Sequence, residues 1–222
     1  LELTRAYAVF ANQGRRVEPI FIKKIADKDG TTLEENLPPV QETLPHQGND
    51  REGEGTNGPA EQVISPETAY IITNLLEGVI RNGTGWRAKA LGRPCAGKTG
   101  TTDDYSDAWF MGYTPDLITG VWVGFDQEEP LGIEETGSRA ACPIWLNYMK
   151  TVLEGKPIKH FAVPPGIIFA KIDPDTGLLA SPSSQNPFFE CFKEGTAPTH
   201  YSEEKPSRPT EFFKFDMDRP PR

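Results

Sequence analysis

The sequence of 222 residues is poor in three features, and each shortage excludes a class of protein. It has no run of about 18 apolar residues, so no segment of it is expected to span a membrane. Basic residues form no run, and 32 Asp and Glu outnumber 23 Lys and Arg, so nucleic acid is not the expected partner. The three cysteines, Cys95, Cys142 and Cys191, lie far apart without a C-x-x-C spacing, which argues against a metal site. We expect buried thiols; one disulfide and an odd thiol is the alternative.

The start of the sequence also lacks an initiator Met and a signal peptide. Residues 1–4 already have the character of a helix interior. We therefore expect this sequence to be part of a longer polypeptide, so that targeting information can lie outside it.

Glycine and proline, in contrast, are abundant at 21 each and predict many loops. Together with acidic residues they dominate residues 34–63, which we interpret as a mobile acidic insertion at the surface. Residues 156–222 are a turn-rich C-terminal extension, and from about Pro198 their composition is typical of a disordered tail. The expected domain is residues 1–155, interrupted by the insertion.

The first part of this domain shows clear signals for helices and turns. Residues 1–13 have the spacing of a helix that ends near Gly14. Residues 17–33, with Asp29-Gly30 at the turn, predict a peripheral hairpin. Ser65 is a good N-cap for a helix over residues 66–81, whose apolar positions recur at helical spacing.

The second part predicts a hairpin and a long helix. Residues 108–113 and 117–125 are strand-like on both faces, as in a sheet that helices cover on both sides. Residues 138–153 form the most periodic helix, with Ser138 as its cap and Gly155 at its end. Its expected buried stripe consists of Ala141, Ile144, Trp145, Tyr148, Met149 and Val152. The predicted fold class is α+β, an antiparallel sheet flanked by helices, with residues 93–102 on an edge strand.

Residues 92–99 match the P-loop pattern G-x-x-x-x-G-K-[ST] letter for letter. A P-loop must follow a buried strand and open a helix at its Lys-Thr end. The preceding residues 86–91 do not read as a buried strand, and Thr99 to Thr102 begin a helix poorly. A nucleotide-binding protein is therefore only a remote alternative.

The other interpretation takes Lys98-Thr99-Gly100 as the K-T-G box of a serine acyl-transfer enzyme. The tripeptide alone is weak, but further motifs accompany it. These are Arg93-Pro94-x-Ala96-Gly97-Lys98-Thr99-Gly100-Thr101-Thr102, Asp104-Tyr105-x-Asp107-Ala108-Trp109-Phe110-x-Gly112-Tyr113-Thr114-Pro115, Ala6-Tyr7-Ala8-x-Phe10-Ala11-Asn12-x-Gly14, Gly83-Thr84-Gly85, Val121-Trp122-Val123-Gly124 and Ile172-Asp173-Pro174-Asp175-Thr176-Gly177-Leu178. Together they closely resemble the C-terminal part of the transpeptidase domain of class A penicillin-binding proteins. Asp103, where Asn is expected, departs from the pattern.

The resemblance implies an enzyme that cross-links peptidoglycan without a cofactor or metal. A serine attacks the D-Ala–D-Ala bond of one stem peptide, an amine of a neighbouring strand takes the acyl group, and β-lactams trap the serine. Lys98 would supply positive charge and assist proton transfer, and the hydroxyls of Thr99 and Thr101 would hold the substrate carboxylate. The N–H of Thr101 would form half of the oxyanion hole, and Gly100 would leave the strand edge open for the substrate.

The expected partners are stem peptides and lipid II-derived glycan strands, β-lactams, and the rest of the same polypeptide. The resemblance places the full protein at the periplasmic face of the bacterial inner membrane, with a glycosyltransferase domain upstream.

A nucleophile is the part of this machinery that the sequence does not supply. Residues 202–205 fit S-x-x-K and residues 184–186 fit S-x-N, but both follow the K-T-G box instead of preceding it. Ser202 also lies in a charged segment, where an adjacent lysine keeps a high pKa. We therefore expect the serine on another part of the polypeptide and no acylation of this chain alone. A non-catalytic binding or scaffolding module of the same fold is the alternative.

Overall fold

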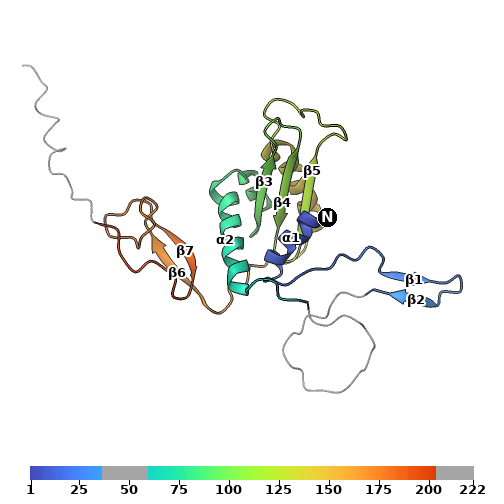
Figure 1. Ribbon diagram of the computed structural model, residues 1–222, viewed down its shortest axis with the longest axis horizontal. Helices are drawn as coiled ribbons and strands as arrows, with labels where there is room; N and C mark the ends of the chain where they lie inside the picture. Colours follow the sequence, from blue (N-terminus) through green and yellow to red (C-terminus); the bar gives the residue numbers. More distant parts are fainter. Residues whose placement is uncertain (37–59, 204–222) are drawn as a thin grey trace, which may run out of the picture. The chain divides into compact units, whose positions relative to one another are not determined.

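The computed structural model describes residues 1–36 and 60–203, and the described residues divide between Pro165 and Gly166 into two compact units. The first unit contains three helices, two short helical turns and two sheets (Figure 1). Its elements are α1 (Glu2–Ala11), β1 (Lys24–Ala26), β2 (Thr32–Glu35), α2 (Pro66–Asn82), η1 (Trp86–Leu91), β3 (Ala96–Thr101), β4 (Ala108–Tyr113), β5 (Ile118–Val123), η2 (Gly137–Ala141) and α3 (Cys142–Val152). The predicted α+β class is confirmed.

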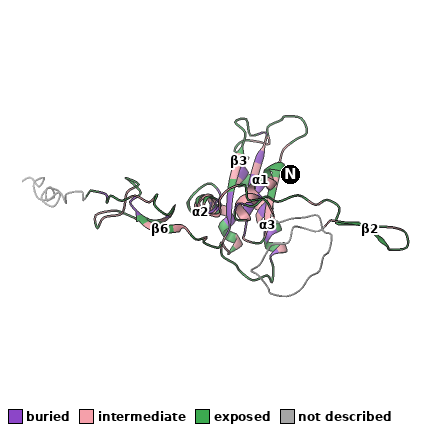
Figure 2. Ribbon diagram, turned by 60° about the horizontal axis from the view of Figure 1, so that its bottom comes forward, coloured by how far each residue is buried: buried purple, intermediate pink, exposed green. Residues whose placement is uncertain are grey.

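The central sheet is antiparallel in the order β3-β4-β5, with β4 in the middle and β3 at an edge, as expected. Helices cover both faces. On one face, the rings of Phe110 and Trp145 pack with centroids 5.0 Å apart, and Trp145 Nε1 donates to the Gly112 carbonyl over 3.1 Å. On the other, the hydroxyls of Thr73 in α2 and Tyr113 in β4 are 2.9 Å apart and buried. The central strand β4 is thus the most buried strand of the unit, whereas β1 and β2 are exposed (Figure 2).

Helix α2 confirms its prediction in detail. Ser65 lies at the N-cap, where its side chain accepts a hydrogen bond from the Thr68 N–H, and Pro66 is the first helical residue. Residues 87–91, a short polar stretch in the sequence, form with Trp86 a turn of 3-10 helix in which Ala88 is buried. Gly92 ends this turn in the left-handed region, at a φ of 72°, which glycine adopts without strain.

The predicted helix over residues 138–153 is wrong at its start. Residues 137–141 form the π-helical turn η2, so Ser138 lies inside a turn and caps nothing, and α3 begins at Cys142. The predicted stripe is also too wide, because Ile144 is 52% exposed and Tyr148 is 49% exposed. The buried part of the stripe is narrower and consists of Ala141, Trp145 and Met149.

The hairpin predicted at residues 17–33 is present but shorter, since only β1 and β2 pair. Glu34 and Glu35, assigned from the sequence to the acidic insertion, belong to β2. The rest of that prediction, residues 37–59, lies outside the described residues, and the described residues 60–63 include Gln62, which forms an isolated bridge with Arg15.

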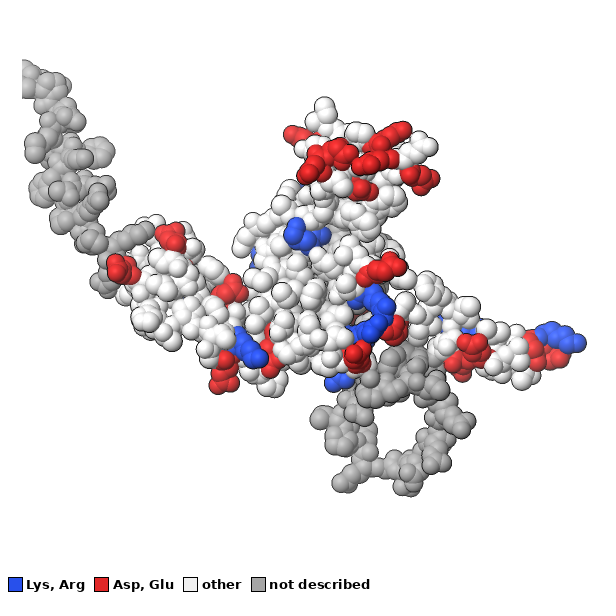
Figure 3. All heavy atoms as spheres, viewed as in Figure 1, with Lys and Arg blue, Asp and Glu red and all other residues white. Residues whose placement is uncertain are grey.

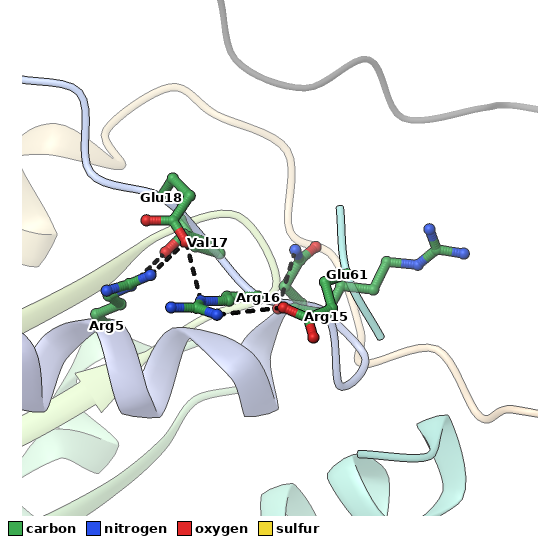
Figure 4. A network of polar contacts seen from close by, with 7 residues as sticks. Arg5, Arg15, Arg16, Val17, Glu18 and Glu61 are labelled. Carbon is green, nitrogen blue, oxygen red and sulfur yellow. Dashed lines mark hydrogen bonds and ion pairs between the residues drawn. The ribbon is translucent and has the colours of Figure 1, made fainter. Parts of the chain in front are cut away.

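A network of ion pairs and hydrogen bonds links α1 to residues 16–18 and to Glu61 (Figure 4). Arg5 pairs with Glu18 and also donates to the Val17 carbonyl over 3.0 Å. Arg16 contacts Glu18 at 2.9 Å and Glu61 at 3.2 Å. Residues that lie on either side of residues 36–60 in the sequence are thereby held together.

The second unit contains a two-stranded antiparallel sheet of β6 (Ile167–Ile172) and β7 (Phe188–Lys193), which the turn-rich composition did not indicate. The expected disorder from Pro198 is wrong for residues 198–203. The Leu179 N–H donates to the His200 carbonyl over 3.0 Å, and the Ser202 N–H donates to the Leu179 carbonyl over 2.8 Å. The remainder of that tail, residues 204–222, lies outside the described residues.

All three cysteines are buried thiols that form no disulfide, as predicted for thiols that pack as small apolar groups. Burial raises the pKa of the Cys95 thiol to about 12 and that of Cys142 to about 11. The disulfide alternative is therefore wrong.

Candidate active site

The K-T-G box lies on β3, whose outer edge has no strand partner among the described residues. The Thr102 N–H donates to the Asp107 carbonyl over 3.2 Å, in register with the ladder that pairs Gly100 with Trp109 and Lys98 with Met111. Hydrogen-bonded and non-hydrogen-bonded pairs alternate along an antiparallel ladder. The backbone groups of Thr99 and Thr101 therefore point away from β4. The open edge presents the Thr101 N–H and the Thr99 carbonyl to a ligand.

Side chains of the box divide between the two faces of the sheet, since neighbours alternate along a strand. Lys98 and Gly100 share one face with their cross-strand partners Met111 and Trp109. A Cβ on Gly100 would lie 3.2 Å from the Trp109 Cβ, so glycine leaves open space on this part of the sheet face. Thr99 and Thr101 point to the opposite face.

Each of the two site hydroxyls is held by a group from a distant part of the sequence. The Thr99 Oγ1 lies 2.7 Å from the Thr84 Oγ1, which belongs to the turn after α2. The Thr101 Oγ1 accepts a hydrogen bond from the Gly137 N–H at 3.0 Å. In the sequence, Thr84 stands out only as part of the Gly83-Thr84-Gly85 motif, and the one signal for Gly137 is that a glycine directly precedes the predicted helix.

The amine of Lys98 is exposed and donates to the Thr99 carbonyl over 2.8 Å. That carbonyl is one of the groups at the open edge. Lys98 therefore lies along the edge, with its positive charge beside the N–H of Thr101 and within reach of an anionic ligand there.

The turn after β3 is held by its own side chains. Thr102 Oγ1 accepts from the Asp107 N–H at 2.9 Å, and Asp104 accepts from both the hydroxyl and the N–H of Ser106. These bonds, the Ser106 hydroxyl first among them, lower the pKa of the Asp104 carboxyl. Asp103, the departure from the expected Asn, is exposed in this turn. These hydrogen bonds thus fix the conformation of the turn at the end of β3.

Acidic side chains gather over the loops at this end of the sheet, at the top of Figure 3. The exposed ones are Asp103, Asp104, Asp126, Glu128, Glu129 and Glu134. The two loops are joined, since the Leu131 N–H donates to the Tyr105 carbonyl over 2.9 Å. No group of His, Cys, Asp and Glu suited to a metal ion occurs in the described residues.

The P-loop alternative fails on this geometry. Lys98 and Thr99 lie in the middle of a strand, whereas a P-loop needs them at the start of a helix. The 3-10 turn η1 also stands where the buried strand before a P-loop would be.

The two motifs rejected as a nucleophile site lie in the second unit. Ser202 is not in a solvated tail, as the sequence suggested, but is buried, with its hydroxyl 2.8 Å from that of Ser184. Ser184 in turn donates to Asp173 over 2.6 Å. Neither serine lies on a helix, so neither has the lysine one helical turn away that activation requires, and Lys205 is outside the described residues.

Comparison with known proteins decides the family. Residues 1–150 match the profile described as penicillin binding protein transpeptidase domain, and residues 163–207 match that of penicillin-binding protein 1A, C-terminal domain. This chain belongs to the penicillin-binding protein transpeptidase family. The resemblance to class A penicillin-binding proteins is thereby confirmed, and the predicted domain boundary at residue 155 stays a prediction.

Relatives and solved structures agree with this assignment. Penicillin-binding protein 1A of Pseudomonas aeruginosa is 41% identical over 93% of this chain and 29% of its own length. The crystal structure of penicillin-binding protein 1A from Haemophilus influenzae is 36% identical, with a TM-score of 0.77 over 91% of this chain and 33% of that one. Penicillin-binding protein A from M. tuberculosis, solved as a ceftriaxone acyl-enzyme complex, shares the fold at 18% identity and a TM-score of 0.50, over 68% of this chain and 31% of that one.

The chain thus spans about a third or less of the length of these relatives. No helix in the part of the chain that the structure describes is both long and apolar enough to cross a bilayer.

Proposed function

We propose that this chain forms one wall of the active site of a peptidoglycan D,D-transpeptidase. In the reaction, a serine Oγ attacks the carbonyl carbon of a D-Ala–D-Ala bond, the C–N bond breaks, and the serine proton goes to the leaving amine of D-alanine. An amine of a second stem peptide then attacks the acyl-enzyme, gives up a proton, and restores the serine hydroxyl. The stem peptides of lipid II-derived glycan strands are the substrates, and β-lactams imitate the donor.

The observation that carries the proposal is the open edge of β3. It presents, on one strand, the N–H donor of Thr101, the exposed amine of Lys98, and the hydroxyls of Thr99 and Thr101. Each of these hydroxyls is fixed by a hydrogen bond to a neighbouring segment. Hydrogen-bond donors stabilise an oxyanion best when they are already in position before the negative charge develops. An extended peptide can pair with such an edge as an added strand. Thr101 N–H then forms half of the oxyanion hole, and Lys98, Thr99 and Thr101 bind the carboxylate, while Gly100 leaves room for the substrate.

The nucleophilic serine lies, in this proposal, on another part of the longer polypeptide. Only residues 202–205 of this sequence fit S-x-x-K, and Ser202 is buried in the second unit with its hydroxyl on Ser184. The full protein acts at the periplasmic face of the inner membrane, where an upstream glycosyltransferase domain accompanies it.

Labelling with a fluorescent penicillin tests the proposal. The full polypeptide that carries these residues is expected to form a covalent adduct, and the isolated 222-residue chain none. Lys98→Ala in the full polypeptide is expected to slow acylation on the order of 100-fold, because it removes the charge at the edge. Lys24→Ala, in the exposed strand β1, is the matched control and leaves the rate unchanged.

Two outcomes would contradict the proposal. An adduct on the isolated chain would mean that the nucleophile is within these residues. A full polypeptide that folds but stays unlabelled would favour the alternative, a non-catalytic module of the same fold.

A further inference from the structure

Gly137 is the first residue of η2 and is buried against the two strands of the active-site edge. Its N–H donates to the Thr101 hydroxyl oxygen at 3.0 Å. It is therefore a backbone donor, 36 residues away in the sequence, that contacts the side chain proposed to bind the substrate carboxylate.

The approach of Gly137 to the sheet is too close for any side chain. A Cβ at this position would lie 2.2 Å from the Trp109 carbonyl oxygen and 2.5 Å from the Gly100 carbonyl oxygen. Both are backbone atoms of paired strands, which cannot move aside as a flexible side chain can. Glycine is needed here for space, because only a bare Cα lets η2 rest on β3 and β4.

The segment that carries Gly137 is anchored independently of Thr101. Ala141 and Cys142, directly after it, are fully buried in the core with Trp145. On its other side, the Leu131 N–H is bonded to the Tyr105 carbonyl. Since Gly137 is held by the core and Thr101 is exposed, the glycine N–H orients the hydroxyl, and the hydroxyl does not position the glycine.

The hydrogen bond has a direct chemical consequence. A hydroxyl oxygen that accepts one N–H keeps its own proton for a second partner. With the Gly137 N–H on one side of the Thr101 oxygen, that proton is directed to another acceptor, such as a carboxylate at the open edge. A hydrogen bond to a charged group is among the stronger ones in proteins.

We propose that Gly137 is a positioning residue for carboxylate recognition. It fixes the Thr101 hydroxyl so that its proton points to the substrate carboxylate. The proposal rests on the function proposed above, because the ligand of Thr101 is the donor carboxylate of that reaction.

The test compares acylation of the full polypeptide by a penicillin with a free carboxylate and by the methyl ester of the same penicillin. Gly137→Ala is expected to slow acylation by the acid roughly tenfold to a hundredfold, because the oriented bond to a charged group is lost. The rate with the ester, which has no carboxylate to recognise, is expected to change little. Thr101→Ser keeps the hydroxyl and the preference for the acid, whereas Thr101→Val loses it.

A double variant and a matched control complete the experiment. Adding Gly137→Ala to Thr101→Val is expected to cost nothing further with the acid, because both changes remove the same bond. Gly78→Ala is the control glycine, since a Cβ there meets nothing within 4 Å, and it leaves both rates unchanged.

The outcomes separate the two proposals. A parent polypeptide that no penicillin acylates overturns the proposed function and this inference with it. If the parent is acylated, equal slowing of acid and ester by Gly137→Ala would mean damage to the fold, and no slowing of either would mean no role. Both results overturn the positioning role alone.

Discussion

At the scale of single residues, the neighbours of a side chain decide its chemistry more than its own type does. Lys98 and Lys24 are both exposed lysines on strands, yet the Lys98 amine donates to the Thr99 carbonyl on the edge strand of the central sheet, whereas Lys24 belongs to the exposed pair of β1 and β2. The same holds for carboxyls. Asp104 is surrounded by hydrogen-bond donors, and its pKa falls, whereas Glu77 in α2 is partly desolvated, and its pKa rises.

Glu77 gives a prediction about pH and stability. Burial raises the pKa of its carboxyl, and the positive charges of Arg81 and His160 offset only part of the effect. When the pKa of a carboxyl is higher in the folded state than in the unfolded state, the folded protein loses stability as the pH rises from the unfolded-state pKa to the folded-state pKa. Glu77→Gln removes the ionisation and is therefore expected to raise the free energy of unfolding above the raised pKa, with no gain below the ordinary pKa.

Urea unfolding of parent and Glu77→Gln at a series of pH values measures this difference. Glu128→Gln, in the exposed loop after β5, is the control and is expected to leave stability unchanged at each pH. A difference between Glu77→Gln and the parent that does not vary with pH would refute the desolvation argument.

At the scale of elements, strand β4 organises the first unit because both of its faces are covered. Phe110 packs on Trp145 of α3, and Tyr113 is bonded to Thr73 of α2. Gly112 leaves the space that this packing needs, because a Cβ at this position would meet the rings of both Phe110 and Trp145.

Gly112→Ala is therefore expected to destabilise the first unit by about 1–3 kcal/mol, the usual cost of overpacking a core. The new Cβ would lie 2.6 Å from Trp145 Cε2 and 2.8 Å from Phe110 Cε1. Denaturant unfolding followed by tryptophan fluorescence measures it, since Trp86, Trp109, Trp122 and Trp145 all belong to this unit. Gly78→Ala, at an open helix position, is expected to be neutral or stabilising. An equally stable Gly112→Ala variant would show that α3 can shift away from the sheet.

In the second unit, the turn after β6 depends on one carboxylate. Asp173 is only 6% exposed, accepts from the Ser184 hydroxyl at 2.6 Å, and accepts from the Asp175 N–H at 2.9 Å. The bond from Ser184 is the main cause of the lowered pKa of this carboxyl. A lowered folded-state pKa contributes stability that is present above the ordinary Asp pKa and is lost as the pH falls through the lowered value.

Asp173→Asn is accordingly expected to weaken the second unit at neutral pH, and the difference from the parent should shrink on acidification. The rate at which Cys191 reacts with a thiol reagent reports opening of this unit, because Cys191 is buried there. Reagents that act in acid, such as dithiodipyridine, allow the whole pH range. An Asp173→Asn variant whose Cys191 reacts no faster than the parent's at neutral pH would contradict the role of this carboxylate.

At the scale of the whole molecule, the three buried thiols divide between the two units and make unfolding measurable. Cys95 and Cys142 lie in the first unit and Cys191 in the second. Burial of all three, and the raised pKa of Cys95 and Cys142, disfavour the thiolate that reacts.

The native protein is therefore expected to react slowly with a thiol reagent at pH 8, and the unfolded, unreduced protein to titrate three thiols per chain. Mass spectrometry after brief labelling identifies which thiol reacted. A thiol that reacts at once in the native state, or fewer than three after unfolding, would contradict the assignment of these cysteines as buried thiols without a disulfide.

The sequence by itself determined the elements whose signals are local. Ser65-Pro66 sets the start of α2 because capping and proline geometry act within one turn. The apolar runs of β4 and β5, joined by a proline-containing turn, predicted the central hairpin, and the motifs around Lys98 predicted the family. The proposed site residues on β3 are consecutive, so their order in the chain already placed them together.

Only the tertiary structure decided what depends on contacts between distant residues. The start of α3 and the exposure of Ile144 and Tyr148 could not be read from periodicity, because a π turn shifts the phase of a helix without changing its composition. Burial of Ser202 and the pairing of β6 with β7 likewise depend on long-range backbone bonds. The hydrogen bond from Gly137 to Thr101 is also a long-range contact. Every residue type except proline carries a backbone N–H, so the sequence cannot show which N–H the fold brings to a particular side chain.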